Sequence, residues 1–185
     1  MADFSLETAR LLLRPPIAGD AEDQFRLLNT GRVMARLGGV KSLEHYRQRH
    51  QMARDSFRED RFGFMMMIEK ASGELVGHCG LKRVNNELAS NVGDHEVGWM
   101  VREDRWRRGY AEEATRAVLD WAFGPIGAPH VVALTSQSNP ASWGLMAKLG
   151  MERRPDLDFV DPAYPPEDNP TIQYSLTAER WRTLR

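Results

Sequence analysis

One stretch near the middle of the chain constrains the fold more than any other. Residues 95–101, His-Glu-Val-Gly-Trp-Met-Val, have the composition of a β-strand, and residues 102–109 form a charged turn that contains four arginines and ends in Gly109. A helical pattern starts directly after this turn and continues until residues 124–125, Gly-Pro, end it. The segment therefore predicts a strand, a basic turn and a helix in direct succession.

Such a turn is suited to bind an anion. The first backbone N–H groups of a helix have no partner within the helix and lie at the positive end of its dipole. Gly109 allows the backbone to approach a ligand closely, and Arg105, Arg107 and Arg108 add positive charge. We therefore expect a phosphate or pyrophosphate site, with a plain solvated turn as the alternative that spacing alone favours.

Composition excludes several other functions. The sequence has neither GxxxxGK[ST] nor GxGxxG, which argues against a nucleoside triphosphatase and a dinucleotide-binding fold. Lys and Arg total 25 against 26 Asp and Glu, so no global field favours nucleic acid or an anionic membrane. The single cysteine and five scattered histidines predict no disulfide and no metal site. Residues 1–7 are not a signal peptide and no long apolar run occurs, so we expect a cytoplasmic protein without a membrane anchor.

The length of 185 residues predicts one domain, residues 1–185. Asp20 stands where a helix N-cap is expected, and residues 155–170 form a loop with five prolines and five acidic residues. The fold class that we expect is α+β with a mixed, mainly antiparallel sheet. The predicted strands are residues 9–14, 62–68, 75–81, 95–101, 131–134 and 171–176, and the clearest predicted helices are residues 42–59, 111–123 and 140–149.

Several segments together resemble a known family. They are Leu-Glu-Thr-Ala-Arg-Leu-Leu-Leu-Arg at residues 6–14, Glu-Val-Gly-Trp-Met at 96–100, Trp-Arg-Arg-Gly-Tyr-Ala at 106–111, Asn-Pro-Ala-Ser at 139–142 and Lys-Leu-Gly-Met at 148–151. Their order and spacing are similar to those of the GNAT superfamily of acetyl-coenzyme A dependent N-acetyltransferases. More narrowly, they resemble the branch named for ribosomal-protein alanine and serine N-terminal acetyltransferases.

The resemblance implies a single GNAT domain with a splayed sheet and helices on both faces. Pantetheine would lie like an extra strand against residues 96–101, and the pyrophosphate would rest on residues 106–111. Trp106 occupies the first place of the superfamily pattern [QR]xxGx[GA], and Arg107 stands where relatives often have glycine. The residues expected to bind acetyl-CoA are Met100, Val101, Trp106, Arg107, Arg108, Gly109, Tyr110, Ala111 and Asn139.

The resemblance also implies catalytic roles. Glu96 is the candidate base for the attacking amine, because an ammonium group must lose a proton before it can attack. Backbone N–H groups near Met100 and Val101 would stabilise the developing oxyanion, and Ser142 would assist the departing thiolate. Structural alternatives are a carboxylate of Glu96 paired with an arginine, a helix N-cap at Asn139 and a first-turn serine at position 142.

The acceptor is the least constrained part. The resemblance implies that the amine enters between residues 28–49 and the loop at 156–169, whose acidic residues favour a cationic amine. A peptide α-amine, a polyamine or an aminosugar would fit. We therefore expect an enzyme that moves acetyl from acetyl-CoA to a primary amine by direct attack. The alternatives are a small-molecule or antibiotic N-acetyltransferase and a non-catalytic coenzyme A binding module, and the chain is a monomer or a homodimer.

Overall fold

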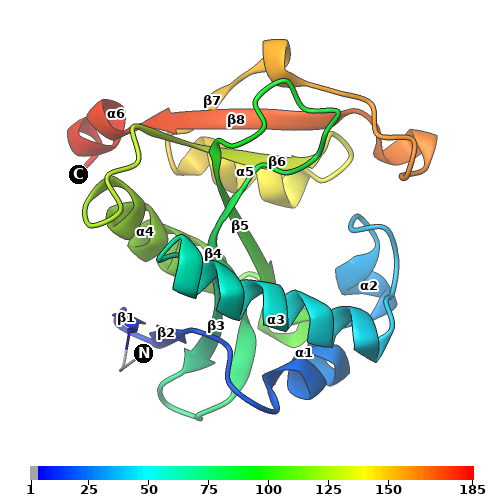
Figure 1. Cartoon of the computed structure of the whole chain (residues 1–185), viewed down its shortest axis with the longest axis vertical. Helices are drawn as coiled ribbons and strands as arrows, with labels where there is room; N and C mark the ends of the chain where they lie inside the picture. The colour runs from blue at the N-terminus through cyan, green and yellow to red at the C-terminus, as the bar shows by residue number, and fades with distance from the viewer. Residues whose placement is uncertain (1–3) are drawn as a thin grey trace. The chain divides into compact units, whose positions relative to one another are not determined.

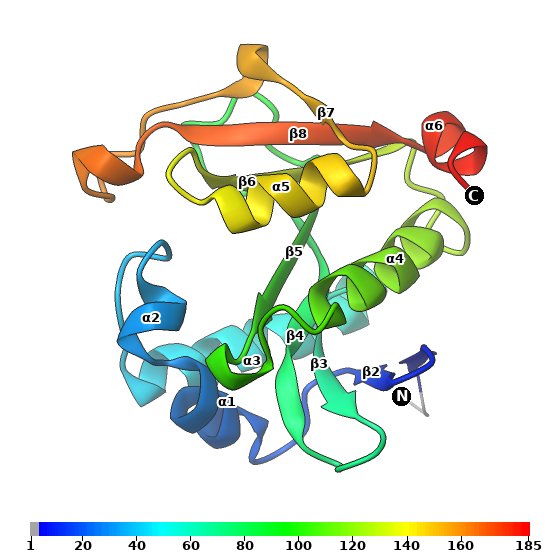
Figure 2. The same ribbon diagram turned by 180° about the vertical axis from the view of Figure 1, so that it is seen from behind.

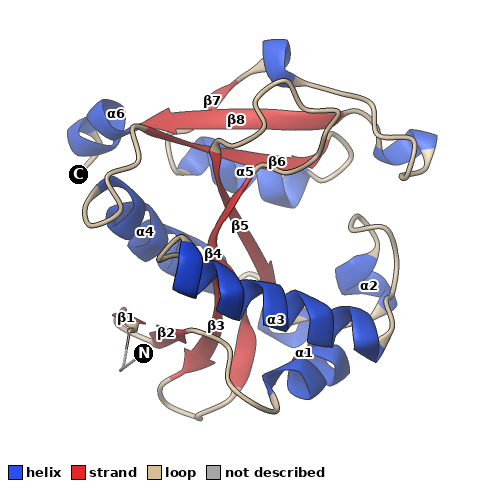
Figure 3. Ribbon diagram, viewed as in Figure 1, coloured by secondary structure: helices blue, strands red, loops and turns tan. Residues whose placement is uncertain are grey.

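The structure, a computed structural model, describes residues 4–185 and contains helices and strands throughout this range (Figure 3). The strands are β1 (Leu6–Glu7), β2 (Leu11–Arg14), β3 (Phe64–Glu69), β4 (Leu75–Arg83), β5 (His95–Val101), β6 (His130–Ser136), β7 (Glu152–Arg153) and β8 (Thr171–Thr177). The helices are α1 (Asp20–Leu28), α2 (Gly31–Met34), α3 (Leu43–Glu59), α4 (Tyr110–Phe123), α5 (Pro140–Lys148) and α6 (Ala178–Thr183), with short 3-10 turns at Glu103–Arg105, Pro155–Leu157 and Pro166–Asp168.

The strands form one mixed sheet in the order β1-β2-β3-β4-β5-β6-β8-β7 (Figure 1). The ladders β1–β2, β2–β3, β3–β4, β6–β8 and β7–β8 are antiparallel, whereas β5 and β6 are parallel. This confirms the expected α+β class with a mainly antiparallel sheet. Within residues 4–185 no helix is both long enough and apolar enough to cross a bilayer.

The chain divides into two compact units. The first comprises the residues up to Lys82 together with Gly98–Val118, and the second comprises Arg83–Val97 and Leu119–Arg185. Strands β4 and β5 and helix α4 each contribute residues to both units.

In the first unit, helices cover both faces of the sheet. Neighbouring side chains of β4 point to opposite faces, as strand geometry requires. His78 contacts Gln24 of α1, whereas the sulfur of Cys79 lies 3.7 Å from the hydroxyl of Thr115 on α4. Figures 1 and 2 accordingly show α3 and α4 in front of the sheet from opposite sides. Cys79 is fully buried, and burial raises the pKa of its thiol to about 12.

A chain of buried and half-buried polar side chains joins α3, α1 and β4. The carbonyl oxygen of Gln24 accepts a hydrogen bond from Nε2 of His50, and the amide nitrogen of Gln24 donates to Nδ1 of His78. Burial lowers the pKa of His50, and burial together with the nearby charge of Arg49 lowers the pKa of His78 to about 3. Both imidazoles are therefore neutral at physiological pH.

In the second unit, β6 is the central strand. It pairs with β8 over its whole length, from His130 opposite Thr177 to Ser136 opposite Thr171. The parallel ladder between β5 and β6 has one register pair, Glu96 with Val132, within the described residues. Most of β5 therefore lies outside this ladder.

The loop at residues 155–170 is ordered by side-chain contacts. The amide nitrogen of Asn169 donates to the carbonyl oxygens of Asp161, Tyr164 and Pro165, and its amide oxygen accepts from the backbone N–H of Asp161 at 2.8 Å. One amide side chain thus satisfies four backbone groups of the loop, which explains how a proline-rich segment keeps a defined path.

Most helix boundaries follow the sequence prediction. Ser42 caps α3 by accepting from the N–H of His45 at 3.1 Å, and α4 ends at Phe123 directly before Gly124. The N-cap assigned to Asp20 is wrong. Gly19 holds the cap position, and the carboxylate of Asp20, inside the helix, binds Arg14 and the N–H of Ile17.

The depressed pKa of His78 predicts a stability that depends on pH. Below the ordinary histidine pKa of 6.5 the unfolded chain takes up a proton that folded His78 does not take up until the pH approaches 3. The free energy of unfolding should therefore fall as the pH falls from 6.5, and it should fall less steeply in His78→Gln. Urea unfolding of both proteins between pH 7 and pH 5 measures this difference, and equal slopes would contradict it.

Candidate functional site

The end of β5 is held firmly. The indole N–H of Trp106 donates to the carbonyl oxygen of Val101 at 2.7 Å, and the N–H of Arg102 donates to the carbonyl oxygen of Val76 at 2.9 Å. Position 77 must be glycine, because a Cβ there would lie 2.1 Å from the carbonyl oxygen of Met100. The backbone of β5 is therefore pressed against β4 where the predicted site begins.

Strand alternation separates the two predicted donors, Met100 and Val101. Backbone groups of successive residues in a strand point to opposite edges. The carbonyl of Met100 faces Gly77 of β4, so its N–H faces β4 as well. The N–H of Val101 points away from β4, on the same edge as the carbonyl that Trp106 binds. Of these two residues, Val101 is therefore the one whose N–H points away from β4.

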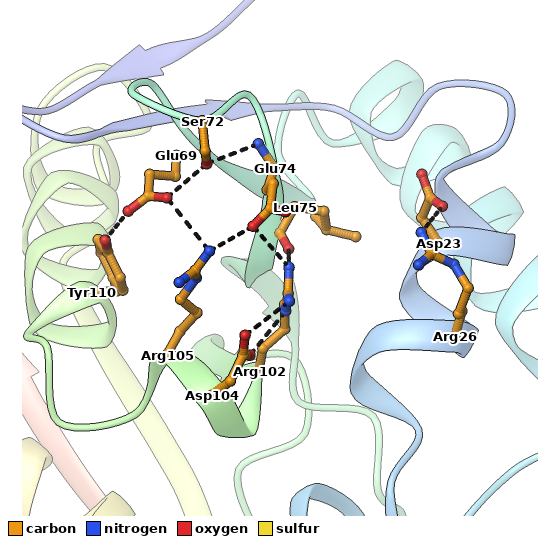
Figure 4. A network of polar contacts seen from close by, with 10 residues as sticks. All are labelled: Asp23, Arg26, Glu69, Ser72, Glu74, Leu75, Arg102, Asp104, Arg105 and Tyr110. Atoms are coloured by element: carbon orange, nitrogen blue, oxygen red, sulfur yellow. Dashed lines mark hydrogen bonds and ion pairs between the residues drawn. The ribbon is translucent and has the colours of Figure 1, made fainter.

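An ion network fixes the turn that follows (Figure 4). Arg105 lies 2.5 Å from a carboxylate oxygen of Glu74 and 3.8 Å from one of Glu69. Arg102 binds both carboxylate oxygens of Asp104 and the carbonyl oxygen of Leu75. Arg105, which the sequence suggested as a phosphate ligand, is thus engaged by two carboxylates of the β3–β4 hairpin and serves the structure of the turn.

A second clamp comes from Arg10, the residue directly before β2. Arg10 binds the carboxylate of Glu113 on α4 at 2.6 Å, donates to the carbonyl oxygen of Arg108 at 2.9 Å and stacks over the ring of Tyr110. Burial alone would raise the pKa of the Glu113 carboxyl. Hydrogen bonds from Thr8 and Arg10 outweigh this effect, so the pKa lies below its usual range. Glu113 is therefore ionised at physiological pH, as its ion pair with Arg10 requires.

The tip of the turn has an unusual backbone. Gly109 has a φ of 82°, and Arg107 has a φ of 59°, a left-handed conformation that side chains other than glycine disfavour. Glycine would adopt the backbone conformation of position 107 without this cost. Arg107 and Arg108 are exposed, and neither makes an ion pair with any residue in the range 4–185. Their charges are therefore directed to solvent at the start of α4.

These features fit a diphosphate. Helix α4 is 14 residues long, and its first turn contains Tyr110 and Ala111 directly after Gly109. N–H groups at a helix start, a glycine that permits close approach and two exposed guanidinium groups supply the donors that a phosphate needs. The side chain of Tyr110 is buried and its hydroxyl donates to Glu69, so only the backbone of this residue is offered to a ligand.

In the second unit, two predicted residues contact each other. The amide nitrogen of Asn139 donates to the hydroxyl oxygens of Ser142 at 3.0 Å and Thr135 at 3.2 Å. Asn139 occupies the N-cap of α5, but its side chain makes no capping hydrogen bond. The hydroxyl of Ser142 accepts this bond and so keeps its own proton for donation.

Glu96 is the second residue of β5 and lies where β5 pairs with β6. It is 9% exposed and forms the single register pair with Val132. A buried carboxylate at the start of a strand is a rigidly placed group, which agrees with either a base or a structural ion.

The acidic loop is partly neutralised. Asp156 and Asp158 form ion pairs with Arg154 and Arg153. Asp161 accepts from Asn86, and Asp168 accepts from Ser138, both at 2.8 Å. Glu167 is exposed. The loop therefore carries less negative potential than its composition suggested.

The structure thus gathers most predicted residues into two groups. Met100 to Ala111 form one continuous segment, and Asn139 is bonded to Ser142. Sequence analysis missed the residues that support the first group, namely Arg10, Glu69, Glu74 and Glu113. Arg10 lies inside the segment 6–14 and Glu113 lies just beyond the segment 106–111, and both segments carried the family resemblance. No local pattern indicates that these two residues pair.

Comparison with known proteins identifies the family of the chain. Residues 10–152 match the family model for the acetyltransferase (GNAT) domain. YkkB of Bacillus subtilis is 31% identical over 156 residues, which are 81% of this chain and 86% of YkkB. The crystal structure of an acetyltransferase from Agrobacterium tumefaciens superposes with a TM-score of 0.76 and 26% identity, covering 95% of both chains.

A ribosomal L7/L12 α-N-protein acetyltransferase, RimL, whose structure contains coenzyme A, has the same fold with a TM-score of 0.77. The two sequences are 13% identical, and the superposition covers 96% of this chain and 99% of RimL. The chain belongs to the GNAT acetyltransferase family, whose members transfer acetyl from acetyl-CoA to amines.

The bond between Trp106 and Val101 can be tested by stability. Trp106→Phe removes the indole N–H and should lower the free energy of unfolding by about 1 kcal/mol, the usual contribution of one hydrogen bond. Arg32→Gln is the matched control, because Arg32 lies over the Trp106 ring and binds Glu103 but leaves the indole bond intact. Urea unfolding measures both, and equal losses would show that ring contacts dominate.

Proposed function

We propose that this protein transfers the acetyl group of acetyl-CoA directly to a primary amine, without a covalent acetyl-enzyme. The observation that carries the proposal is the turn at Gly109, which combines a helix start, a left-handed backbone and two exposed arginines that form no ion pair with residues 4–185. Membership of the GNAT family supports it. The acceptor that we propose is a protein N-terminus or a small amine.

The diphosphate of acetyl-CoA is assigned to the N–H groups of Gly109 to Ala111, with Arg107 and Arg108 as charged partners. Charge-assisted hydrogen bonds from guanidinium to phosphate are among the stronger polar contacts. Because Arg105 and Arg10 are already bound to carboxylates, they hold the backbone of the turn in place and do not compete for the ligand.

The reaction needs three groups. Glu96, directly or through water, takes a proton from the amine as the amine attacks the thioester carbonyl. The N–H of Val101 stabilises the negative charge that develops on the carbonyl oxygen. The hydroxyl of Ser142, oriented by Asn139, donates to the sulfur as the carbon–sulfur bond breaks. The acetylated amine and coenzyme A are then released.

Cofactor binding is the first test. Saturating acetyl-CoA should raise the melting temperature, since at a hundred times Kd a ligand adds about 2.7 kcal/mol to stability. Arg108→Gln should weaken acetyl-CoA about tenfold, because one charged phosphate contact is lost. Arg58→Gln, which removes an ion pair with Asp55 on α3, is the control and should bind normally.

Two substitutions at position 107 distinguish the effect of the Arg107 charge on acetyl-CoA binding from the effect of its backbone conformation. Arg107→Gly removes the charge and relaxes the left-handed residue, whereas Arg107→Ala removes the charge and keeps the strain. Equal loss of acetyl-CoA affinity in both variants would assign the effect to charge. No loss in Arg107→Gly, Arg107→Ala and Arg108→Gln, or no thermal shift in the wild type, would refute the diphosphate site.

The chemistry is tested by steady-state kinetics. Ser142→Ala should lower kcat about tenfold to a hundredfold at unchanged Kd for acetyl-CoA, because its hydroxyl acts when the thiolate leaves. Glu96→Gln should reduce kcat/KM most at low pH, where the amine is protonated and deprotonation limits the rate. An unchanged pH profile in Glu96→Gln, or a pure loss of affinity in Ser142→Ala, would remove these roles.

A further inference from the structure

One face of the first unit carries a histidine that the proposed chemistry does not use. The rings of His78 and Phe64 meet edge to face, with centroids 5.2 Å apart. A Cβ at Gly98 would lie 3.0 Å from Cζ of Phe64, so the Phe64 ring covers the backbone of β5 at this glycine. His78 and Phe64 therefore form a wall on the face of β5 to which Gly98 belongs, two residues after Glu96.

The position of the proton on His78 follows from its partner. The amide nitrogen of Gln24 can only donate, so Nδ1 of His78 must accept and carries no proton. With its nitrogen toward His78, the Gln24 amide turns its oxygen toward Nε2 of His50, which then donates to it. In this arrangement the neutral His78 ring carries its proton on Nε2.

A histidine in this state is a hydrogen-bond donor and not a base. Its Nδ1 is occupied by Gln24, which leaves Nε2–H as the polar group at the other end of the half-buried ring. Phe64 offers no polar atom beside it. A ligand that lies against this wall therefore needs an oxygen to accept from Nε2, because a buried donor without a partner is costly.

We propose that His78 is a specificity-determining residue that donates from Nε2 to a carbonyl oxygen adjacent to the reacting amine of the acceptor. This inference rests on the proposed acetyl transfer and names the acceptor class: α-amino amides, as in the first residue of a peptide, in preference to simple alkylamines. A site built around a hydrogen bond rejects the analogue that lacks its partner more strongly than an apolar pocket does.

The kinetic test uses two probes of similar shape, L-alaninamide and (S)-3-methylbutan-2-amine, in which an isopropyl group replaces the carboxamide. The ratio of their kcat/KM values is compared between proteins, so that the different basicity of the two amines cancels. His78→Leu should lower the preference for alaninamide about tenfold, which corresponds to 1.4 kcal/mol. His78→Gln, whose amide nitrogen can reach the place of Nε2 and donate, should keep the preference within about threefold.

His130→Gln is the matched control, because His130 lies at the start of β6, outside the segments assigned to acetyl-CoA and to the acceptor, and its ratio should equal that of the wild type. An unchanged ratio in His78→Leu, a His78→Gln variant as impaired as His78→Leu, or a wild type that acetylates other amines but neither probe would each overturn the proposal.

A second measurement does not depend on turnover. In the full-length protein with 15N-labelled histidine, the ring signals of His78, assigned by their loss in His78→Gln, should show a protonated Nε2 and an unprotonated Nδ1 between pH 6 and 8. A proton on Nδ1, or uptake of a second proton in this range, would overturn the assignment of His78 as a donor. A wild type that acetylates no amine while showing the expected tautomer would instead refute the proposed function.

Discussion

The pairing of arginines with carboxylates around residues 102–113 is the constraint on which the ligand-binding turn depends. Arg105 and Arg10 bring Glu74 of the hairpin and Glu113 of α4 against the turn, and Arg10 also holds the carbonyl of Arg108. These contacts leave Arg107 and Arg108 exposed at the tip. Arg105 and Arg10 therefore hold the turn in shape, whereas Arg107 and Arg108 are available to a phosphate.

The sequence predicted the order of the elements and the strand–turn–helix segment correctly because both depend on local patterns. Residues 95–101 form β5 with the boundaries that the sequence indicated, and the strands predicted at 62–68 and 75–81 are the antiparallel pair β3 and β4. The helix capped by Ser42 also followed from its local signal. Short elements such as α2, β7 and α6 were missed, since a few residues carry too little periodicity to be distinguished from turns.

The supporting residues of the site could not be predicted because their partners are distant in sequence. Arg10 and Glu113 are separated by 103 positions, and the three members of the His50–Gln24–His78 relay come from α3, α1 and β4. The role of Arg105 was misassigned for the same reason. Charge counted along a segment does not reveal which guanidinium groups a folded chain has already neutralised, and the same holds for the acids of the loop at 155–170.

The state of Cys79 has a practical consequence. The chain has one thiol, and it is fully buried with a pKa of about 12. Disulfide reagents react with thiolates, so the native enzyme should be silent toward a chromogenic aromatic disulfide. Coenzyme A released during turnover would then be the sole source of colour. If one equivalent of thiol per protein reacts in the absence of substrate, this would report that the protein has unfolded and exposed Cys79.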